Sequence, residues 1–302
     1  MANLFIIILN YNGYKDTIPC IHSLLSFYEK DEDCNILVVD NASTDQSSQF
    51  IQDEFGDKII FLQSDKNGGY AYGNNIGIRY AIEHGADYIC LLNNDTEAVC
   101  DAIRPCAEYL ANHPETAFVG PAVVDYYSHE IQNTGGSISI KTGKTKEINK
   151  EKTLEEVDKP FIECDMIFGM CTVFRKELVR EIGYISEKFF LFYEETDWCY
   201  RALRKGYKCK SLTTVSVLHK GSESVAKVNS LKEYLMERNR VVFIKRNATS
   251  LGLLEFLIYD FFKTVYRSVR FKAPFIKLTR YHLDGLLDRI DQRFPFIYFG
   301  EE

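Results

Sequence analysis

The first apolar stretch of the chain, residues 4–9, is an unbroken run of leucine, phenylalanine and isoleucine. A strand that is buried on both faces has such a continuous run, as in parallel sheets covered by helices on each side. The polar residues 10–13 end the run, and residues 16–28 place apolar side chains at helical spacing. This pattern predicts a buried strand followed by a helix.

The same strand-and-helix unit recurs along the first third of the chain. Further strands are expected at residues 35–39, 59–63 and 88–92, with helices ending near residue 55 and covering residues 70–84. Strands that alternate with helices of this length form βαβ units. We therefore predict an α/β protein with a mainly parallel sheet flanked by helices.

After about residue 98 this regular alternation ends. Helices are expected at residues 99–112 and 195–205. Strands are expected at residues 117–123, 163–174 and 208–218, the second of them interrupted at Gly169. Residues 132–145 predict a hairpin or irregular sheet, and residues 144–159 predict an exposed charged loop. From residue 231 onward the spacing is helical, with Pro274 as the only obvious break. The chain therefore ends in a helical extension.

Composition and charge narrow the class of protein. The 302 residues are 46% hydrophobic and 26% charged, as in a globular protein, and the net charge of −7 argues against nucleic acid as a partner. No apolar stretch approaches the roughly 18 residues of a membrane span, and the start of the chain lacks the features of a signal peptide. Nine cysteines without a Cys-x-x-Cys pair predict buried thiols in a reducing compartment, the cytoplasm.

Polar side chains stand at the ends of three predicted strands, at residues 10–12, at Asp40 and at residues 93–95. In open α/β sheets a ligand binds beyond the carboxyl ends of the strands. We expect these positions to face one crevice, although each alone also fits a turn or a helix cap. Asp95 supplies an oxygen ligand for a hard divalent cation, whose other ligands a diphosphate could provide.

A second group of acids follows an aromatic segment. Glu194, Glu195 and Asp197 come directly after residues 189–193, all of which are aromatic or apolar. Mutual repulsion and partial burial would raise a carboxyl pKa toward that of a general base. Acids are also favoured at a helix N-terminus, and both interpretations can hold together.

Two single residues have alternative interpretations. Trp198, the only tryptophan, fits either core packing or a stacking surface for a sugar. His219 follows a predicted strand, where it is either structural or a metal ligand.

An ordered set of motifs then identifies a family. The chain resembles the bacterial and archaeal family 2 glycosyltransferases with the GT-A fold, especially the rhamnosyltransferase-like group, over about residues 4–246. The matching residues are 8–12 (Ile-Leu-Asn-Tyr-Asn), 38–45 (Val-Val-Asp-Asn-Ala-Ser-Thr-Asp), 67–71, 74–75 and 77, 91–96 (Leu-Leu-Asn-Asn-Asp-Thr), 169, 174–175, 183, 189–190, 194–198, 201, 206, 219, 222 and 238–239.

This resemblance implies roles for individual residues. It implies metal ligation by Asp95 and His219, with Mn²⁺ or Mg²⁺ as the cofactor. Glu195 takes the position of the family's usual aspartate base, with Glu194 and Asp197 as alternatives. The residues implied at the nucleotide and donor are Leu9, Asn10, Tyr11, Asn12, Asp40, Asn67, Gly68 and Asn94, and those implied at the acceptor are Trp198 and Arg238.

The implied reaction is an inverting transfer of a sugar from a nucleotide-diphosphate sugar to a glycan or lipid-linked acceptor in cell-surface polysaccharide synthesis. The resemblance implies a catalytic domain at residues 1–246, with a nucleotide-binding half at 1–98 and an acceptor half at 99–246. Two departures are notable: the metal motif has Asn at residues 93 and 94, and the base position holds glutamate. An inactive nucleotide-sugar-binding module is an alternative, and so is a nucleotidyltransferase, although no glycine-rich loop follows the first strand.

The extension at residues 247–302 mixes basic and aromatic residues. Between residues 261 and 283 there are six lysines or arginines and no acids. This mixture suits an anionic membrane surface, which would make the protein peripheral to the inner face of the cell membrane. Packing against a second subunit in a homodimer fits the same pattern.

Overall fold

The computed structural model describes residues 2–221, 229–272 and 274–291. As predicted, its first part alternates strands and helices. The elements are β1 (Leu4–Asn10), α1 (Tyr14–Tyr28), β2 (Cys34–Asp40), α2 (Ser47–Phe55), β3 (Ile60–Gln63), α3 (Gly69–Glu83) and β4 (Tyr88–Asn93). These four strands lie side by side and parallel, in the order β4-β1-β2-β3.

The continuous apolar run of β1 is explained by helices on both faces of the sheet. Leu4, Ile6 and Ile8 point toward α1, α2 and α4 (Ile103–Asn112). Phe5 and Ile7 point to the other face, toward α3, α5 (Lys176–Ile182) and α6 (Glu194–Arg204). Because successive side chains of a strand alternate between faces, a strand covered on both sides needs apolar residues throughout.

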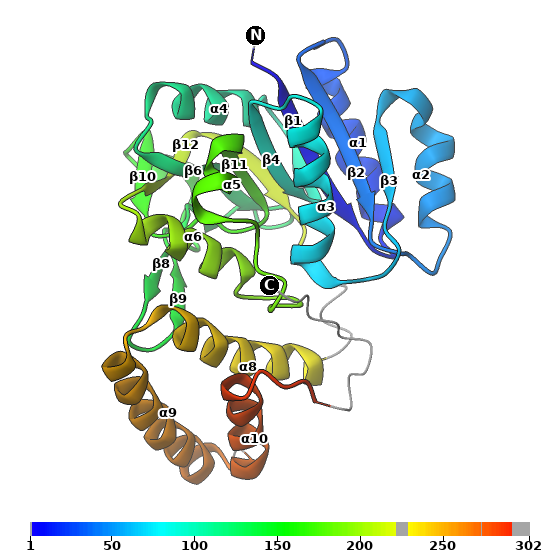
Figure 1. Ribbon diagram of the computed structural model, residues 1–302. Helices are drawn as coiled ribbons and strands as arrows, with labels where there is room; N and C mark the ends of the chain where they lie inside the picture. The colour runs from blue at the N-terminus through cyan, green and yellow to red at the C-terminus, as the bar shows by residue number, and fades with distance from the viewer. Residues whose placement is uncertain (1, 222–228, 273, 292–302) are drawn as a thin grey trace.

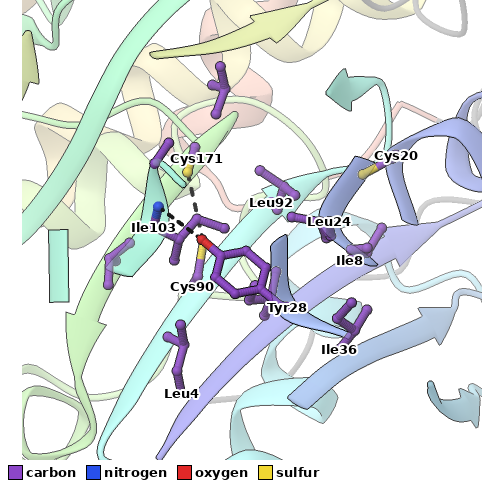
Figure 2. Close-up of a cluster of buried hydrophobic side chains, with 14 of the residues drawn as sticks. Leu4, Ile8, Cys20, Leu24, Tyr28, Ile36, Cys90, Leu92, Ile103 and Cys171 are labelled. Carbon is purple, nitrogen blue, oxygen red and sulfur yellow. Dashed lines mark hydrogen bonds between the residues drawn. The ribbon is translucent and has the colours of Figure 1, made fainter. Parts of the chain in front are cut away.

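Figure 2 shows part of the first of these apolar layers, with Tyr28 among the aliphatic side chains. The Tyr28 hydroxyl accepts a hydrogen bond from the backbone of Ile103 (3.4 Å), which ties α1 to the start of α4. All nine cysteines are free thiols, seven of them buried, as predicted.

The second part of the sheet is mixed. It contains β5 (Thr96–Ala98), β6 (Thr116–Asp125), β7 (Ile131–Asn133), β10 (Phe161–Cys164), β11 (Cys171–Arg175) and β12 (Lys208–His219), and beside it lies a hairpin of β8 (Gly136–Ser139) and β9 (Lys144–Glu147). β11 runs antiparallel to both β4 and β6, whereas β6 and β12 are parallel. The sheet is therefore parallel through β1–β4 and again between β6 and β12, and the antiparallel β11 joins these two parts.

Long-range pairing also moves some predicted boundaries. The helix expected from residue 99 begins at Ile103, because residues 96–98 pair with the far end of β12 as β5. The single strand expected at residues 163–174 is two strands with different partners, since β10 pairs with β12 and β11 pairs with β4. The charged segment after residue 144 starts with β9 rather than with a loop.

The C-terminal extension consists of three helices, α8 (Asn229–Asn247), α9 (Ser250–Phe271) and α10 (Phe275–Leu286). In Figure 1 they form a group next to α6 and the β8–β9 hairpin. Pro274 begins α10, as predicted, but it is not the only break, because Thr249 caps a new helix by accepting a hydrogen bond from the backbone of Gly252 (3.1 Å). In the described ranges, no helix has both the length and the apolar composition needed to span a bilayer.

Candidate active site

The ends of β1 and β2 meet, as predicted, through Asn10 and Asp40. The Asn10 side-chain amide donates hydrogen bonds to Asp40 Oδ1 (2.6 Å) and to Ser43 Oγ (3.1 Å). Burial favours the neutral form of Asp40, but hydrogen bonds, chiefly from Ser43, outweigh it and hold the pKa of this carboxyl below its ordinary value. Both side chains are enclosed. Both carboxylate oxygens of Asp40 already accept hydrogen bonds within the protein, and its contact with a nucleoside stays a prediction.

The loop after β1 offers a more accessible surface. Tyr11 is 43% exposed and follows directly on the buried Asn10. Asn12 adopts a left-handed backbone (φ 50°), and its side-chain oxygen accepts a hydrogen bond from the backbone of Thr44 (2.8 Å). Leu9 is half-buried and lies so close to Gly73 of α3 that a Cβ added there would be 2.3 Å from Leu9 Cδ1. Tyr11 is therefore the residue of this loop with an aromatic surface open to a base.

A hydrogen-bonded chain extends from β1 to the end of β4. Thr17 Oγ1 donates to Asn10 Oδ1 (2.7 Å) and accepts from the Asn94 side chain (3.0 Å). A Cβ added at Gly13 would lie 2.6 Å from Asn94 Nδ2, so only glycine leaves room for this amide. Asn94, predicted at the donor, is thereby joined to the loop that carries Asn10 and Tyr11.

The loop before α3 lies against the aromatic segment that precedes α6. Asn67 Oδ1 accepts hydrogen bonds from the Asn41 side chain and from the backbone of Gly69, both at 3.0 Å. Gly69 has φ +87°, and a Cβ there would be 2.1 Å from the Phe190 carbonyl oxygen. Glycine is needed at this position both for its backbone conformation and for the close approach. Gly68 lies between these two residues, so both predicted donor-loop positions belong to one tightly packed turn.

Asp95 and His219, the two predicted metal ligands, lie together although they are far apart in the sequence. Pairing of β5 with β12 sets Thr96 opposite His219. As a result His219 Nε2 is 3.2 Å from Asp95 Oδ1. Both side chains are almost fully buried, and His219 Nδ1 is 2.7 Å from Gln132 Oε1.

These residues fit a divalent cation. His219 Nε2 is buried and has no hydrogen-bond partner, although a carboxylate oxygen faces it. A buried nitrogen without a partner is costly, and a cation bound by nitrogen and oxygen together would remove that cost. Within the described ranges no group of three or more His, Cys, Asp or Glu side chains could hold a metal. A bound diphosphate or water could supply further oxygen ligands.

The two glutamates at the start of α6 differ in their surroundings. Glu195 is half-buried and its Oε1 accepts a hydrogen bond from the backbone of Gly169 (3.3 Å). Glu194 is buried, with Oε2 lacking a partner. Burial raises the pKa of both carboxyls above the ordinary value, and the charge of Glu195 raises that of Glu194 further.

The segment that leads into these acids has an unusual backbone. Phe192 (φ 70°) and Tyr193 (φ 76°) are consecutive non-glycine residues in the left-handed region, a conformation that costs about 1–3 kcal/mol per residue. Asn239 of α8 holds them in place, because its side-chain amide donates to the carbonyls of Leu191 (2.9 Å) and Phe192 (3.0 Å). The Tyr193 hydroxyl donates to the Gly143 carbonyl (2.8 Å). The position of the acids thus depends on α8.

The acids and the candidate metal ligands are linked through one turn of chain. Gly169 donates its backbone N–H to Glu195, and the carbonyl of the next residue, Met170, accepts from the backbone of Asn93 (3.1 Å). Asn93 is the last residue of β4 and lies two positions before Asp95. Glu195 and Asp95 are therefore at the same edge of the sheet.

Three predicted site residues have structural roles instead. Asp197 is fully enclosed, and its carboxylate accepts hydrogen bonds from Arg201 (3.0 Å) and Asn247 (2.7 Å), so its prediction as an alternative base is wrong. Trp198 is 1% exposed between Phe118 and Phe174. It packs in the core because α6 turns this face to the sheet, and the prediction that it binds acceptor is wrong.

Arg238 is likewise 1% exposed. Its guanidinium donates to the Lys188 carbonyl (2.8 Å) and to the Asn239 side chain (2.7 Å). An acceptor has no access to it, so its predicted acceptor role is corrected to one of holding the segment before α6. Ser222, part of the motif after His219, lies outside the described residues.

Sequence reasoning missed Thr17 and Gln132, and it gave Ser43 only as part of the motif at residues 38–45. Thr17 lies within a predicted helix but carries no distinctive pattern, and only the packing of α1 on β1 brings it to Asn10. Gln132 could not be found from its own surroundings, because its partner His219 is 87 residues away.

Comparison with known proteins identifies the family of the chain. The family model described as glycosyl transferase family 2 matches residues 5–183. The low-salt glycan biosynthesis hexosyltransferase Agl10 of Haloferax volcanii is 29% identical over 248 residues, covering 80% of this chain and 75% of that protein. The dTDP-rhamnosyl transferase RfbF of Shigella flexneri is 23% identical over 262 residues, covering 83% of each.

Solved structures share the fold. S. aureus TarS 1–349 in complex with UDP-GlcNAc has a TM-score of 0.60 at 15% identity, covering 98% of this chain and 84% of that one. GalNAc-T7 with UDP, GalNAc and Mn²⁺ has a TM-score of 0.57 at 14% identity, covering 80% of this chain and 51% of that one. At such low identity the likeness concerns the fold alone, which is the GT-A fold that the sequence predicted.

Proposed function

The chain belongs to glycosyl transferase family 2, and from that premise we propose that it is an inverting, metal-dependent glycosyltransferase. The donor is a nucleotide-diphosphate sugar, and the acceptor is a glycan or lipid-linked hydroxyl in cell-surface polysaccharide synthesis. Residues 1–98 form the donor half of the catalytic domain and residues 99–246 the acceptor half. The observation that carries the proposal is the placement of Glu195 and the Asp95–His219 pair at one edge of the sheet, joined through Gly169 and Met170.

The donor side of the site is the carboxyl end of β1, β2 and β4. Tyr11 offers an exposed ring to the base, and the Asn67–Gly69 turn lies where the chain approaches the acidic segment. Similar proteins support this class of donor, since RfbF is a dTDP-rhamnosyl transferase and TarS was solved with UDP-GlcNAc. These similar proteins support a nucleotide sugar as the class of donor. A screen of nucleotide sugars would identify which sugar is transferred.

Asp95 and His219 would hold the cation, Mn²⁺ or Mg²⁺. GalNAc-T7, which has the same fold, was solved with UDP and Mn²⁺. When bound, the metal would neutralise charge on the diphosphate leaving group. The contribution of this chain is a carboxylate oxygen and an imidazole nitrogen 3.2 Å apart in a buried setting.

Glu195 would act as the general base. It takes the proton of the acceptor hydroxyl, the hydroxyl oxygen forms a bond to the anomeric carbon, and the bond from that carbon to the diphosphate oxygen breaks with its electron pair. Attack from the face opposite the nucleotide inverts the anomeric configuration. The raised pKa of Glu195 supports this role, because a base works best when its pKa approaches the working pH.

Two adjacent variants test the base. We expect Glu195→Gln to abolish sugar transfer while nucleotide-sugar binding, measured by isothermal titration calorimetry, is kept. Glu194→Gln tests the alternative base one residue away, and we expect it to keep transfer because that carboxyl is buried. Transfer by Glu195→Gln at the native rate would refute its role as base. A product of retained configuration in an NMR spectrum would refute the inverting mechanism.

We also propose that the protein works in the cytoplasm, with α9 and α10 on an anionic membrane surface. Leu251, Leu254, Ile258, Phe262 and Val269 form an exposed stripe along α9, with Val269 80% exposed. Successive members are three, four, four and seven residues apart, which puts them on one side of the helix. Side chains of Phe256 and Asp260 on the opposite side pack into the protein.

Basic residues flank this stripe, which favours anionic lipid as its partner. Arg270, Lys272 and Arg280 are exposed at the end of α9 and on α10, beside the 83% exposed Ile276. An amphipathic helix binds a membrane surface through apolar burial together with attraction of its cations to anionic lipids.

Liposome flotation tests this surface. We expect the protein to float with vesicles that contain phosphatidylglycerol, and the double variant Phe262→Glu with Val269→Glu to stay at the bottom. Tyr127→Glu is the control, because Tyr127 is 72% exposed on the catalytic domain. Failure of the native protein to float would refute the proposal, and a native dimer that the double variant dissociates would assign the stripe to a second copy.

A further inference from the structure

Gln132 lies behind the candidate metal site and contacts only one of its two ligands. It belongs to β7, which pairs with β6, and its Oε1 is 2.7 Å from His219 Nδ1. The other end of its amide, Nε2, donates to Asp125 Oδ2 (2.9 Å) and to the His219 carbonyl (3.0 Å). One side chain therefore contacts both the ring and the backbone of His219.

The orientation of this amide follows from its partners. A backbone carbonyl only accepts hydrogen bonds, and so does an ionised carboxylate. Asp125 accepts with its other oxygen, Oδ1, from the backbone N–H groups of Tyr127 (3.0 Å) and Ser128 (2.9 Å), as a carboxylate does. The amide nitrogen must therefore face Asp125 and the carbonyl. Its oxygen then faces His219 Nδ1, which must be the protonated nitrogen of the neutral ring.

We propose that Gln132, held by Asp125, is a positioning residue that fixes neutral His219 as the Nδ1–H tautomer, with the Nε2 lone pair directed at the cation site beside Asp95. This inference rests on the proposed metal site. Metal-bound histidines commonly donate their second ring N–H to an oxygen, which sets the tautomer and the orientation of the ring. The acceptor used here is an amide oxygen on a neighbouring strand.

The alternative tautomer shows why the acceptor matters. If Nε2 carried the proton, the N–H would lie beside Asp95 Oδ1, 3.2 Å from the nitrogen, and a small rotation of either side chain would let it donate there. That hydrogen bond would occupy the nitrogen and one carboxylate oxygen at once, so neither would be available to a cation. Gln132 disfavours this closed arrangement because Nδ1 would then lack its proton and face the amide oxygen with a lone pair.

The test uses Gln132→Met, which keeps a side chain of similar length but removes the acceptor. In metal-free protein labelled with ¹⁵N-histidine, NMR should show the Nδ1–H tautomer of His219 in the native protein and mainly the Nε2–H tautomer in the variant. Binding of Mn²⁺ in the presence of UDP, followed by electron paramagnetic resonance, should weaken by about 10–100-fold. Gln52→Met on the exposed part of α2 is the control and should change neither measurement.

A rescue variant separates positioning from a general loss of structure. In Asp125→Asn combined with Gln132→Glu, the new carboxylate can accept from His219 Nδ1 and from the new amide at residue 125, while the His219 carbonyl loses the donor that Gln132 supplied at 3.0 Å. We expect this pair to restore both the tautomer and the Mn²⁺ affinity toward native values.

The results distinguish the inference from the metal site on which it rests. Absence of Mn²⁺ binding to the native protein with UDP would refute the metal site itself. Native affinity in Gln132→Met, or an Nε2–H tautomer in the native protein, would overturn the role of Gln132 alone.

Discussion

Asn239 is the residue whose removal should separate the placement of the acids from the rest of the fold. Its side-chain amide satisfies the carbonyls of Leu191 and Phe192 (2.9 and 3.0 Å), and its oxygen accepts from Arg238 (2.7 Å). Asn239→Ala removes all three hydrogen bonds in a fully enclosed position. The strained backbone at Phe192 and Tyr193 then loses the contacts that hold it.

The expected loss of stability follows from the groups left unsatisfied. Two buried carbonyls without partners cost about 1–3 kcal/mol each, or about 2–6 kcal/mol together. For a chain of this size, about 2 °C of melting temperature is lost per kcal/mol, so Tm should fall by about 4–12 °C. A displacement of Glu195 by about 1 Å should lower kcat by about 100-fold, while the donor-binding constant stays near the native value because the donor loops are untouched.

Two measurements on one preparation check this reasoning. Differential scanning calorimetry gives Tm, and nucleotide release from saturating donor and acceptor gives kcat. Leu110→Ala is the control, since it empties a buried position of α4 on the opposite face of the sheet, at a cost of about 2–5 kcal/mol. If both variants lose similar stability and also keep the same kcat, Asn239 does not position the acids and the argument fails.

Three further predictions concern the same site and the extension. Gly169→Ala would bring a Cβ within 2.6 Å of the Tyr70 hydroxyl and 3.2 Å of Glu195 Oε1, so kcat should fall by at least about tenfold with little change in donor affinity; native kcat would contradict this. Because the base must be ionised and burial raises the pKa of Glu195 above 4.5, kcat/KM should fall on acidification through a midpoint above 4.5, and a flat profile would refute the assignment. Burial lowers the pKa of His282, but hydrogen bonds to carboxylates on α8 and α9, chiefly Asp260, outweigh it and raise that pKa above 6.5. The resulting stability is present at low pH and lost as pH rises through the raised pKa, so Tm should decline with pH in the native protein and not in His282→Gln.

The architecture of the first part of the protein could be predicted from the spacing of its apolar residues. The apolar run at residues 4–9 requires cover on both faces, and the strand that it predicts is β1, packed between α1 and α3. Asn10 and Asp40 meet because parallel strands bring their carboxyl ends to one edge of the sheet. These features depend on local periodicity and on a rule of parallel sheets, both of which can be read along the chain.

Which polar and aromatic side chains reach the candidate active site depends on the tertiary structure. Trp198 and Asp197 lie in the same acidic-aromatic motif as Glu195, yet α6 buries both, and only its side toward Gly169 keeps Glu195 half-exposed. The residue types in a motif do not predict which side of the helix will be buried by the rest of the chain.

The candidate metal site depends even more on distant pairings. Asp95 and His219 meet because the three residues of β5 pair with the far end of β12, and Gln132 reaches His219 from β7, a strand with no pattern of its own. Such contacts join segments about ninety or more residues apart, and their energy lies in burial and hydrogen bonds that form only once the sheet has assembled. Periodicity in the sequence indicates which side of a helix or strand is apolar. The hydrogen-bond partner of each polar atom depends on how the helices and strands pack in the assembled fold.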